Sequence, residues 1–295
     1  EIRLCDWSSD VCSSDLALAA VQYAEALYEA GELERAEQIL RIYLVAAREF
    51  GLGDDFVVRG HITLSRLAWH RGEYERAFGV LGELEYLGHR DNLARLVASS
   101  ELERSRVALL RGDIEAAAAY LRQAQGRLAH RGELAMTLPL HDVESIAVVR
   151  LRLKVRTADM DGLAEAIAEL EAAIASAREQ QCHRLRLHLA LLRIEALRRA
   201  GRAAEAAGAL GGVIEEAAAE GVIQPFADEG PMIAAMVLAW LRSAAARQKP
   251  QHAGMAAHAE RLEATCVAVM GGEPRDAVEP TGERSERDEG FAALT

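Results

Sequence analysis

AGELERAEQIL, at residues 30–40, is the first of four similar phrases that decide the fold of this chain. The others are RGEYERAFGVL (residues 71–81), RGDIEAAAAYL (111–121) and AGRAAEAAGAL (200–210). Each phrase has Gly at its second position, Ala five residues after that Gly, and Leu nine residues after it. The glycines are 41, 40 and 89 residues apart, and the last step is about two periods with one degenerate copy inside. A fixed period of this size predicts a helical solenoid, because one repeat cannot bury its apolar face alone and must stack on its neighbours.

Each repeat is predicted to be two helices joined by a short turn at the Gly. Residues 16–30 carry apolar side chains at helical spacing, and Gly31 follows them where a helix-ending Gly is expected. Pro139 lies in residues 131–140, which are expected to form a longer connection. The five expected helix pairs span residues 16–30 and 33–50, 54–70 and 74–87, 92–111 and 114–129, 141–156 and 161–179, and 181–200 and 203–220.

The small residue of each phrase explains how the two helices of a pair can approach closely. A methyl side chain leaves room for the partner helix, and the Leu four residues later fills the groove. The alanines at this place are Ala36, Ala77, Ala117 and Ala206.

The composition fits packed helices and excludes several functions. Hydrophobic residues make up 51% of the chain and aromatic residues only 5%. The formal net charge is −12, and there is no basic stripe of the kind that contacts nucleic-acid phosphates. The longest apolar run, residues 231–241, is too short to cross a bilayer. Cys182 and Cys266 are single and far apart in sequence, so no disulfide framework is indicated and a reducing cytoplasmic location is expected.

The chain divides into four parts by composition. Residues 1–16 resemble translated sequencing-adapter read-through, show no helical period, and are expected to be an artefact outside the fold. Residues 17–220 hold the repeats, and residues 221–270 are expected to add C-terminal helices at 232–247 and 252–270. Residues 271–295 are expected to be a charged linker or tail, because such a composition cannot bury enough apolar surface to order itself.

The repeats resemble the tetratricopeptide repeat (TPR) superfamily, with Gly, an apolar residue and Ala at matching places. Repeats of 40–47 residues, longer than the ordinary 34, resemble the sensor region of the MalT-like branch of LuxR-type bacterial transcription regulators. The most specific part is GVIQPFADEGP (residues 221–231), which is similar to the phrase that follows the last repeat in that family. It departs from the family pattern at Gln224, where Arg is commoner, and at Ala227, where Leu is commoner. The resemblance implies an all-α, right-handed superhelical solenoid of about five helix-turn-helix repeats plus C-terminal helices.

The resemblance also implies a function. An ATPase domain would precede residue 17, and a helix-turn-helix domain, typically opening with Leu-Thr, would follow, starting at Leu294-Thr295. This segment would then receive a signal by binding a protein partner or a small effector in the solenoid groove. It would make no direct contact with nucleic acid or membrane, and uncapped ends could cause self-association. The alternative is a stand-alone repeat scaffold that binds other proteins, and the segments flanking this one would discriminate between the two.

No catalytic, metal or cofactor site is expected. A phosphate-binding loop needs a Lys just after its Gly, and neither Lys154 nor Lys249 follows a Gly. His183 and His188 are five residues apart and His252 and His258 six apart, so neither pair has the i, i+4 spacing of helix-borne metal ligands. The chain is therefore predicted not to be an enzyme.

First helices of stacked pairs usually line the concave surface of a solenoid, and this defines the candidate binding residues. They are Arg59, Arg66, Trp69 and Arg106, with Glu25 and Tyr28 beside them. Arginines with an aromatic ring form a plausible platform for an anionic or flat ligand or a peptide. In the alternative interpretation, Trp69 packs between hairpins and the arginines pair with neighbouring acids.

Overall fold

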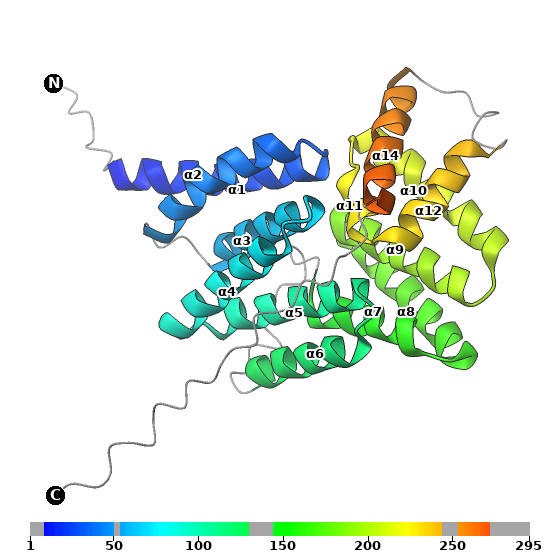
Figure 1. Ribbon diagram of the computed structural model, residues 1–295, viewed down its shortest axis with the longest axis horizontal. Helices are drawn as coiled ribbons and strands as arrows, with labels where there is room; N and C mark the ends of the chain where they lie inside the picture. Colours follow the sequence, from blue (N-terminus) through cyan, green and yellow to red (C-terminus); the bar gives the residue numbers. More distant parts are fainter. Residues whose placement is uncertain (1–8, 50–53, 130–143, 244–252, 272–295) are drawn as a thin grey trace, which may run out of the picture.

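The structure is a computed structural model that describes residues 9–49, 54–129, 144–243 and 253–271. These residues form thirteen helices and contain no strand. Consecutive helices pair and stack into a curved array (Figure 1). The predicted all-α solenoid of helix pairs is therefore confirmed.

Five hairpins make up the array. Their helices are α1 (Ser9–Glu29) and α2 (Leu33–Glu49), α3 (Asp54–His70) and α4 (Tyr74–Arg90), α5 (Ala94–Leu110) and α6 (Ile114–Ala129), α7 (Ile146–Thr157) and α8 (Met160–Glu179), and α9 (His183–Arg199) and α10 (Ala203–Glu220). Three further helices follow: α11 (Gln224–Asp228), α12 (Pro231–Arg242) and α14 (Ala253–Gly271). None of the helices that the structure describes is both long and apolar enough to cross a membrane.

Two helix starts differ from the sequence predictions by five residues or more. The first helix begins at Ser9, so residues 9–16 are helical although their sequence lacks an apolar period. The seventh begins at Ile146 instead of residue 141, because the Ser145 side chain accepts a hydrogen bond from the Val148 backbone N–H and caps the helix there. Residues 1–8 and the predicted tail at 272–295, with Leu294-Thr295, lie outside the described residues.

The turn glycines have the backbone conformation that the phrases predict. Gly31, Gly72, Gly112 and Gly201 all have φ between 75° and 79°, in the left-handed region that side chains disfavour. The residue after each Gly donates its backbone N–H to a carbonyl five residues earlier, as Glu32 does to Leu27 at 2.8 Å. This is the Schellman motif, which satisfies the last carbonyl groups of the helix.

The degenerate fourth repeat keeps the packing residues but not the turn. Its Ala166 and Leu170 are fully buried in α8, at the place that Ala36 and Leu40 occupy in α2. Its turn has no left-handed Gly; instead the Asp159 side chain accepts the Gly162 backbone N–H at 2.9 Å and caps α8. The helix interface thus persists where the turn chemistry has changed.

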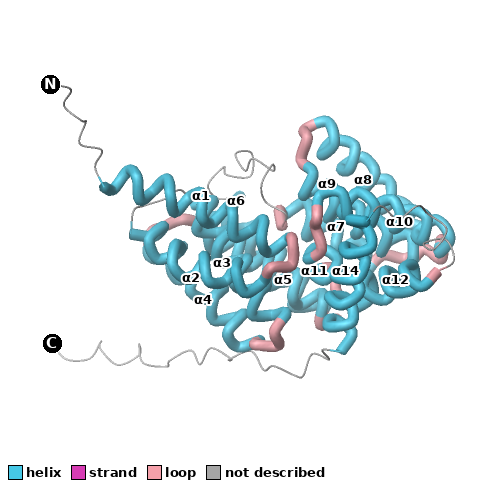
Figure 2. Tube along the Cα trace, turned by 90° about the horizontal axis from the view of Figure 1, so that it is seen from above, coloured by secondary structure: helices cyan, strands magenta, loops and turns pink. Residues whose placement is uncertain are grey.

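The array curves until its two ends meet. The Ile223 backbone N–H donates to the Glu29 carbonyl at 2.7 Å, and Arg184 of α9 forms ion pairs with Glu25 and Glu29 of α1. Arg261 of α14 donates to the carbonyl of Ala30. Figures 1 and 2 show α11 lying between the N-terminal hairpins and the C-terminal ones. Residues 221–230 therefore close the array.

A large side chain at the phrase alanine should overpack a hairpin. Replacing the fully buried Ala206 with Leu should lower the free energy of unfolding by about 1–3 kcal/mol, because α10 lies against α9 without room for three more carbons. Urea denaturation measures the loss. The same change at the exposed neighbour Ala207 should leave the midpoint unchanged, and equal effects at the two positions would contradict this packing.

Candidate functional site

The 221–231 segment lies in the concave side of the array, and its sequence explains its path. Gly221 (φ 73°) ends α10 in the left-handed conformation, and Gly230 (φ 86°) turns the chain again before Pro231 starts α12. The positive φ of Gly230 disfavours any side chain, and a Cβ there would lie 2.6 Å from Leu110 Cδ2, so the Leu110 side chain would also have to move. Between the two glycines every residue from Ile223 to Glu229 is buried, including two carboxylates.

Asp228 is held by residues of the first three hairpins. The Tyr28 hydroxyl donates to Asp228 Oδ1 at 2.6 Å, and His70 Nε2 lies 2.7 Å from the same oxygen. Arg66 Nη1 donates to Asp228 Oδ2 at 3.2 Å. Arg106 Nη1 donates to the Asp228 backbone carbonyl at 2.8 Å. One residue thus joins α1, α3 and α5 to α11.

Glu229 is held by the remaining two hairpins. Arg152 of α7 uses both terminal nitrogens, and its Nη2 donates to Glu229 Oε1 at 2.8 Å. His188 Nδ1 of α9 lies 3.1 Å from the same oxygen. Asp228 and Glu229 together therefore contact the first helix of every hairpin.

Two more acids complete this buried network. Glu103 accepts hydrogen bonds from Arg66 at 2.8 and 3.0 Å and from Arg106 at 2.6 and 2.9 Å. Glu144 bridges Arg66 (3.2 Å) and Arg152 (3.0 Å). Paired guanidinium–carboxylate hydrogen bonds are among the strongest in proteins, and a buried charge needs such partners. We call these residues the concave network: Tyr28, Arg66, His70, Glu103, Arg106, Glu144, Arg152, His188, Asp228 and Glu229.

The network keeps its two central acids ionised. Burial by itself would raise the pKa of Asp228, but Arg66, His70 and Arg106 together hold it well below its ordinary value. Burial would likewise raise the pKa of Glu229, and Arg152 and His188 lower it. Both groups are therefore carboxylates at neutral pH.

The structure does not bring the four sequence-predicted binding residues together on one open surface. Arg66 and Arg106 are each 2% exposed and share Glu103, as the alternative interpretation described. Arg59 forms an ion pair with Glu25. Trp69 packs on Tyr74, with ring centroids 4.6 Å apart, and edge-on against Phe78. Ligand binding by these residues stays a prediction.

Two cavities lie beside the network. The smaller, of about 40 Å³, is lined by both charged and apolar side chains and has room for one or two waters. It is lined by Glu25, Tyr28, Val58, Arg59, Ile62, Thr63, Arg66, Ser99, Glu144 and Arg184. The larger, of about 490 Å³, lies against Trp69, and we call it the Trp69 cavity. Arg59 and Arg66 thus share one cavity, and Trp69 lines the other.

Sequence reasoning gave no binding or structural role to the acids of the network or to Arg152, His70 and His188. One signal was present in the repeats. The residue six places before the turn Gly is charged in all four phrase-bearing repeats: Glu25, Arg66, Arg106 and Glu195. A charge at a repeated position on an inward-facing helix indicates a buried partner. For Arg66 and Arg106, Asp228 in the 221–231 segment is such a partner, whereas Glu25 and Glu195 pair with arginines of the helices.

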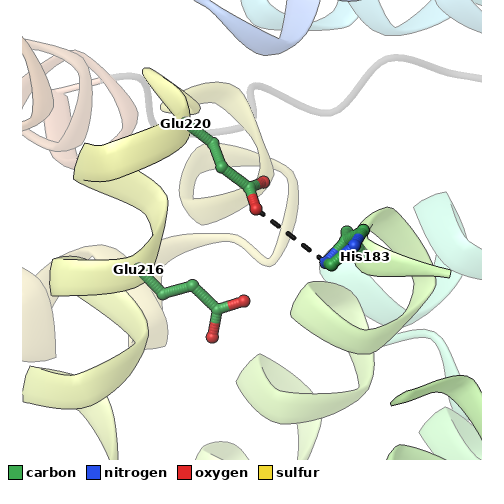
Figure 3. A group of neighbouring side chains, drawn as sticks. All are labelled: His183, Glu216 and Glu220. Atoms are coloured by element: carbon green, nitrogen blue, oxygen red, sulfur yellow. Dashed lines mark ion pairs between the residues drawn. The ribbon is translucent and has the colours of Figure 1, made fainter. Parts of the chain in front are cut away.

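His183, Glu216 and Glu220 form the one group of three possible metal ligands found among the described residues (Figure 3). Their ligand atoms lie within 4.8 Å of one another at the surface. Arg186 already donates to Glu216 at 2.6 Å, so a guanidinium occupies the place where a cation would be held. We assign no metal to this group.

Removing the charge of Asp228 should destabilise the whole array. Asp228→Asn keeps the shape of the side chain but leaves Arg66 without one of its buried anions, so we expect a loss of about 3–5 kcal/mol in the free energy of unfolding. Chemical denaturation measures it. Glu171→Gln, which breaks a surface pair with Arg193, is the control and should have little effect. A loss in Asp228→Asn no larger than in the control would show that the network contributes little.

Stability should also depend on pH through Asp228 and Glu229. Their folded pKa values are lowered, so their contribution is fully present above the unfolded value of about 4, declines as the pH falls below that value, and is lost once the pH falls through the folded pKa values. Denaturation midpoints between pH 7 and pH 3 should therefore decline below about pH 5. The double variant Asp228→Asn/Glu229→Gln should decline less steeply, and an identical slope would rule out this source.

Comparison with protein-family models gives one finding. The model of the MalT-like TPR region matches residues 12–243, which include nearly all of the five hairpins together with α11 and α12. No match is found among the curated proteins. Because the match covers well over half of the sequence, this chain belongs to the family of MalT-like TPR regions.

Proposed function

We propose that this chain is the signal-receiving repeat region of a bacterial LuxR-type transcription regulator that acts in the cytoplasm. Membership of the family of MalT-like TPR regions supports the more general part of this proposal, that the chain is a helical repeat region of a MalT-type regulator. In the proposal, ATPase and DNA-binding activities belong to other parts of the polypeptide. The segment itself is not an enzyme and needs no cofactor, and an effector or a protein partner biases it between two states.

The observation that carries the proposal is the position of Asp228 and Glu229. They contact all five hairpins, and α12 begins two residues after Glu229. A ligand that binds one arrangement of the hairpins better than another would change these contacts and thereby the path of the chain into α12. Such a difference in affinity is what coupling between distant sites requires.

The alternative, a stand-alone scaffold, fits less well. A repeat scaffold binds a partner segment along its concave groove, whereas here α11 fills the groove at Arg66 and Arg106. A scaffold of this shape would have to use its outer surface. Repeat regions of this kind generally mediate protein interactions, so a protein partner remains part of both proposals.

The test uses the complete gene recovered from the source DNA, expressed with a reporter under a promoter that the protein controls. Glu229→Gln should change reporter output without inducer by about tenfold, because it weakens the contacts of α7 and α9 with α11. The milder His188→Asn should move output in the same direction. Lys154→Gln, which breaks only exposed ion pairs with Glu165 and Glu169, is the control and should leave output unchanged.

Two outcomes would overturn the regulator proposal. One is unchanged output in both network variants, with helix content and soluble yield intact. The other is a reading frame that encodes neither an ATPase nor a helix-turn-helix domain. The second result would favour the scaffold, and partner capture with the intact protein would follow.

A further inference from the structure

The Trp69 cavity is formed by parts of the chain that are far apart in sequence. The turns after α1 and α3 supply one side, the α11–α12 junction supplies the floor, and α14 supplies the other side. Its volume of about 490 Å³ lies within the range of small-molecule sites. It is lined by Gly31, Leu33, Trp69, His70, Arg71, Gly72, Tyr74, Leu110, Gln224, Ala227, Gly230, Pro231, Thr265, Ala268 and Val269.

The lining favours a flat and mainly apolar molecule. Trp69 and Tyr74 are both partly exposed, and their rings are tilted by 57° to form an aromatic corner. Leu33, Leu110 and Val269 add aliphatic surface around it. An aromatic corner of this kind binds a planar ring by offset stacking and edge contacts.

The charges in the lining are already paired within the protein. Arg71 forms an ion pair with Glu37, and His70 lies against Asp228. Among the described residues, the lining contains no carboxylate, and its other polar groups are the indole N–H of Trp69, the amide of Gln224, the hydroxyl of Thr265 and the phenol of Tyr74. A charged ligand would lose its hydration without gaining a counter-ion, whereas a neutral one needs only one or two hydrogen bonds. The cavity therefore fits a neutral molecule.

An occupant would also connect α14 to the first two hairpins. The helix packs on α10, α11 and α12, and on the side of α1 its Arg261 donates to the Ala30 carbonyl. Thr265, Ala268 and Val269 of this helix line the cavity together with Leu33, Trp69 and Tyr74. A bound molecule would fill this space and hold α14 in place.

We propose that the Trp69 cavity is a binding site for a neutral, flat, predominantly apolar small molecule, and that the bound molecule fixes α14 against the turns of the first two hairpins. Only the role of this site as a signal input rests on the proposed function, and ligand binding itself does not. His70 lines the cavity and contacts Asp228, so occupancy is coupled to the concave network.

The experiment titrates the full chain with N-phenyl-1-naphthylamine, a neutral fluorophore with a naphthalene and a phenyl ring that brightens in apolar sites. We expect saturable binding of one molecule per chain, with quenching of tryptophan emission that is lost in Trp69→Phe and kept in Trp240→Phe. Ala268→Phe places a ring in the cavity from an exposed position and should weaken binding by at least about tenfold. Ala257→Phe, exposed on the same helix but outside the lining, is the matched control and should bind as the unmodified chain does.

Hydrogen exchange separates the site from its effect on α14. The probe should slow amide exchange in residues 255–270 of the unmodified chain and of Ala257→Phe, but not of Ala268→Phe. Equal binding by Ala268→Phe and Ala257→Phe, or no saturable binding, would overturn the site. Saturable binding without slower exchange in α14 would overturn the clamping role. Neither result depends on whether the complete gene encodes a regulator, so the two proposals can fail separately.

Discussion

The structure depends on the burial of three guanidinium groups on the concave side of the array. Arg66, Arg106 and Arg152 cannot be withdrawn from water without carboxylate partners, because an unpaired buried charge costs several kcal/mol. Glu103 and Glu144 supply part of this negative charge, and Asp228 and Glu229 supply the rest from outside the repeats, to Arg66 and Arg152 respectively. The requirement brings the 221–231 segment into the groove, and with it α11, the turn at Gly230 and the start of α12. The path of the C-terminal part is thus set by electrostatics in the repeats.

A groove filled in this way favours particular ligands. An extended peptide would have to displace α11 and expose the paired charges of the concave network, at a cost that few peptide contacts could offset. A compact molecule can instead use space that the packing leaves open beside the network. The Trp69 cavity offers such space, and His70 connects it to Asp228. A small effector is therefore easier to reconcile with the closed arrangement than a peptide in the groove.

The sequence predicted local features well and long-range pairings poorly. A left-handed Gly, a small residue and a Leu all act within one hairpin, so their spacing was enough to locate the helix pairs. The fourth helix pair lacks the left-handed Gly but keeps the buried Ala166 and Leu170. Arg66 and Asp228 are 162 residues apart, and no spacing rule relates them. The start of α1 was missed because residues 9–16 carry no apolar period, yet they continue a helix whose later turns are packed. The sequence identified these arginines as inward-facing. It indicated that they need buried partners only indirectly, through the charged residue that recurs six places before each turn Gly.

The contact between the first and last hairpins changes how such an array should fold. In an open solenoid each repeat touches only its neighbours, so stability is nearly a sum over adjacent pairs and the ends can fray separately. Here the Glu29 carbonyl accepts the Ile223 amide, and Arg184 pairs with Glu25. Neither terminal hairpin is therefore a free end, and loss of one removes contacts from the other. Unfolding should accordingly be cooperative across the repeats, and folding slower than the local helix content implies, because the closing contacts join distant parts of the chain.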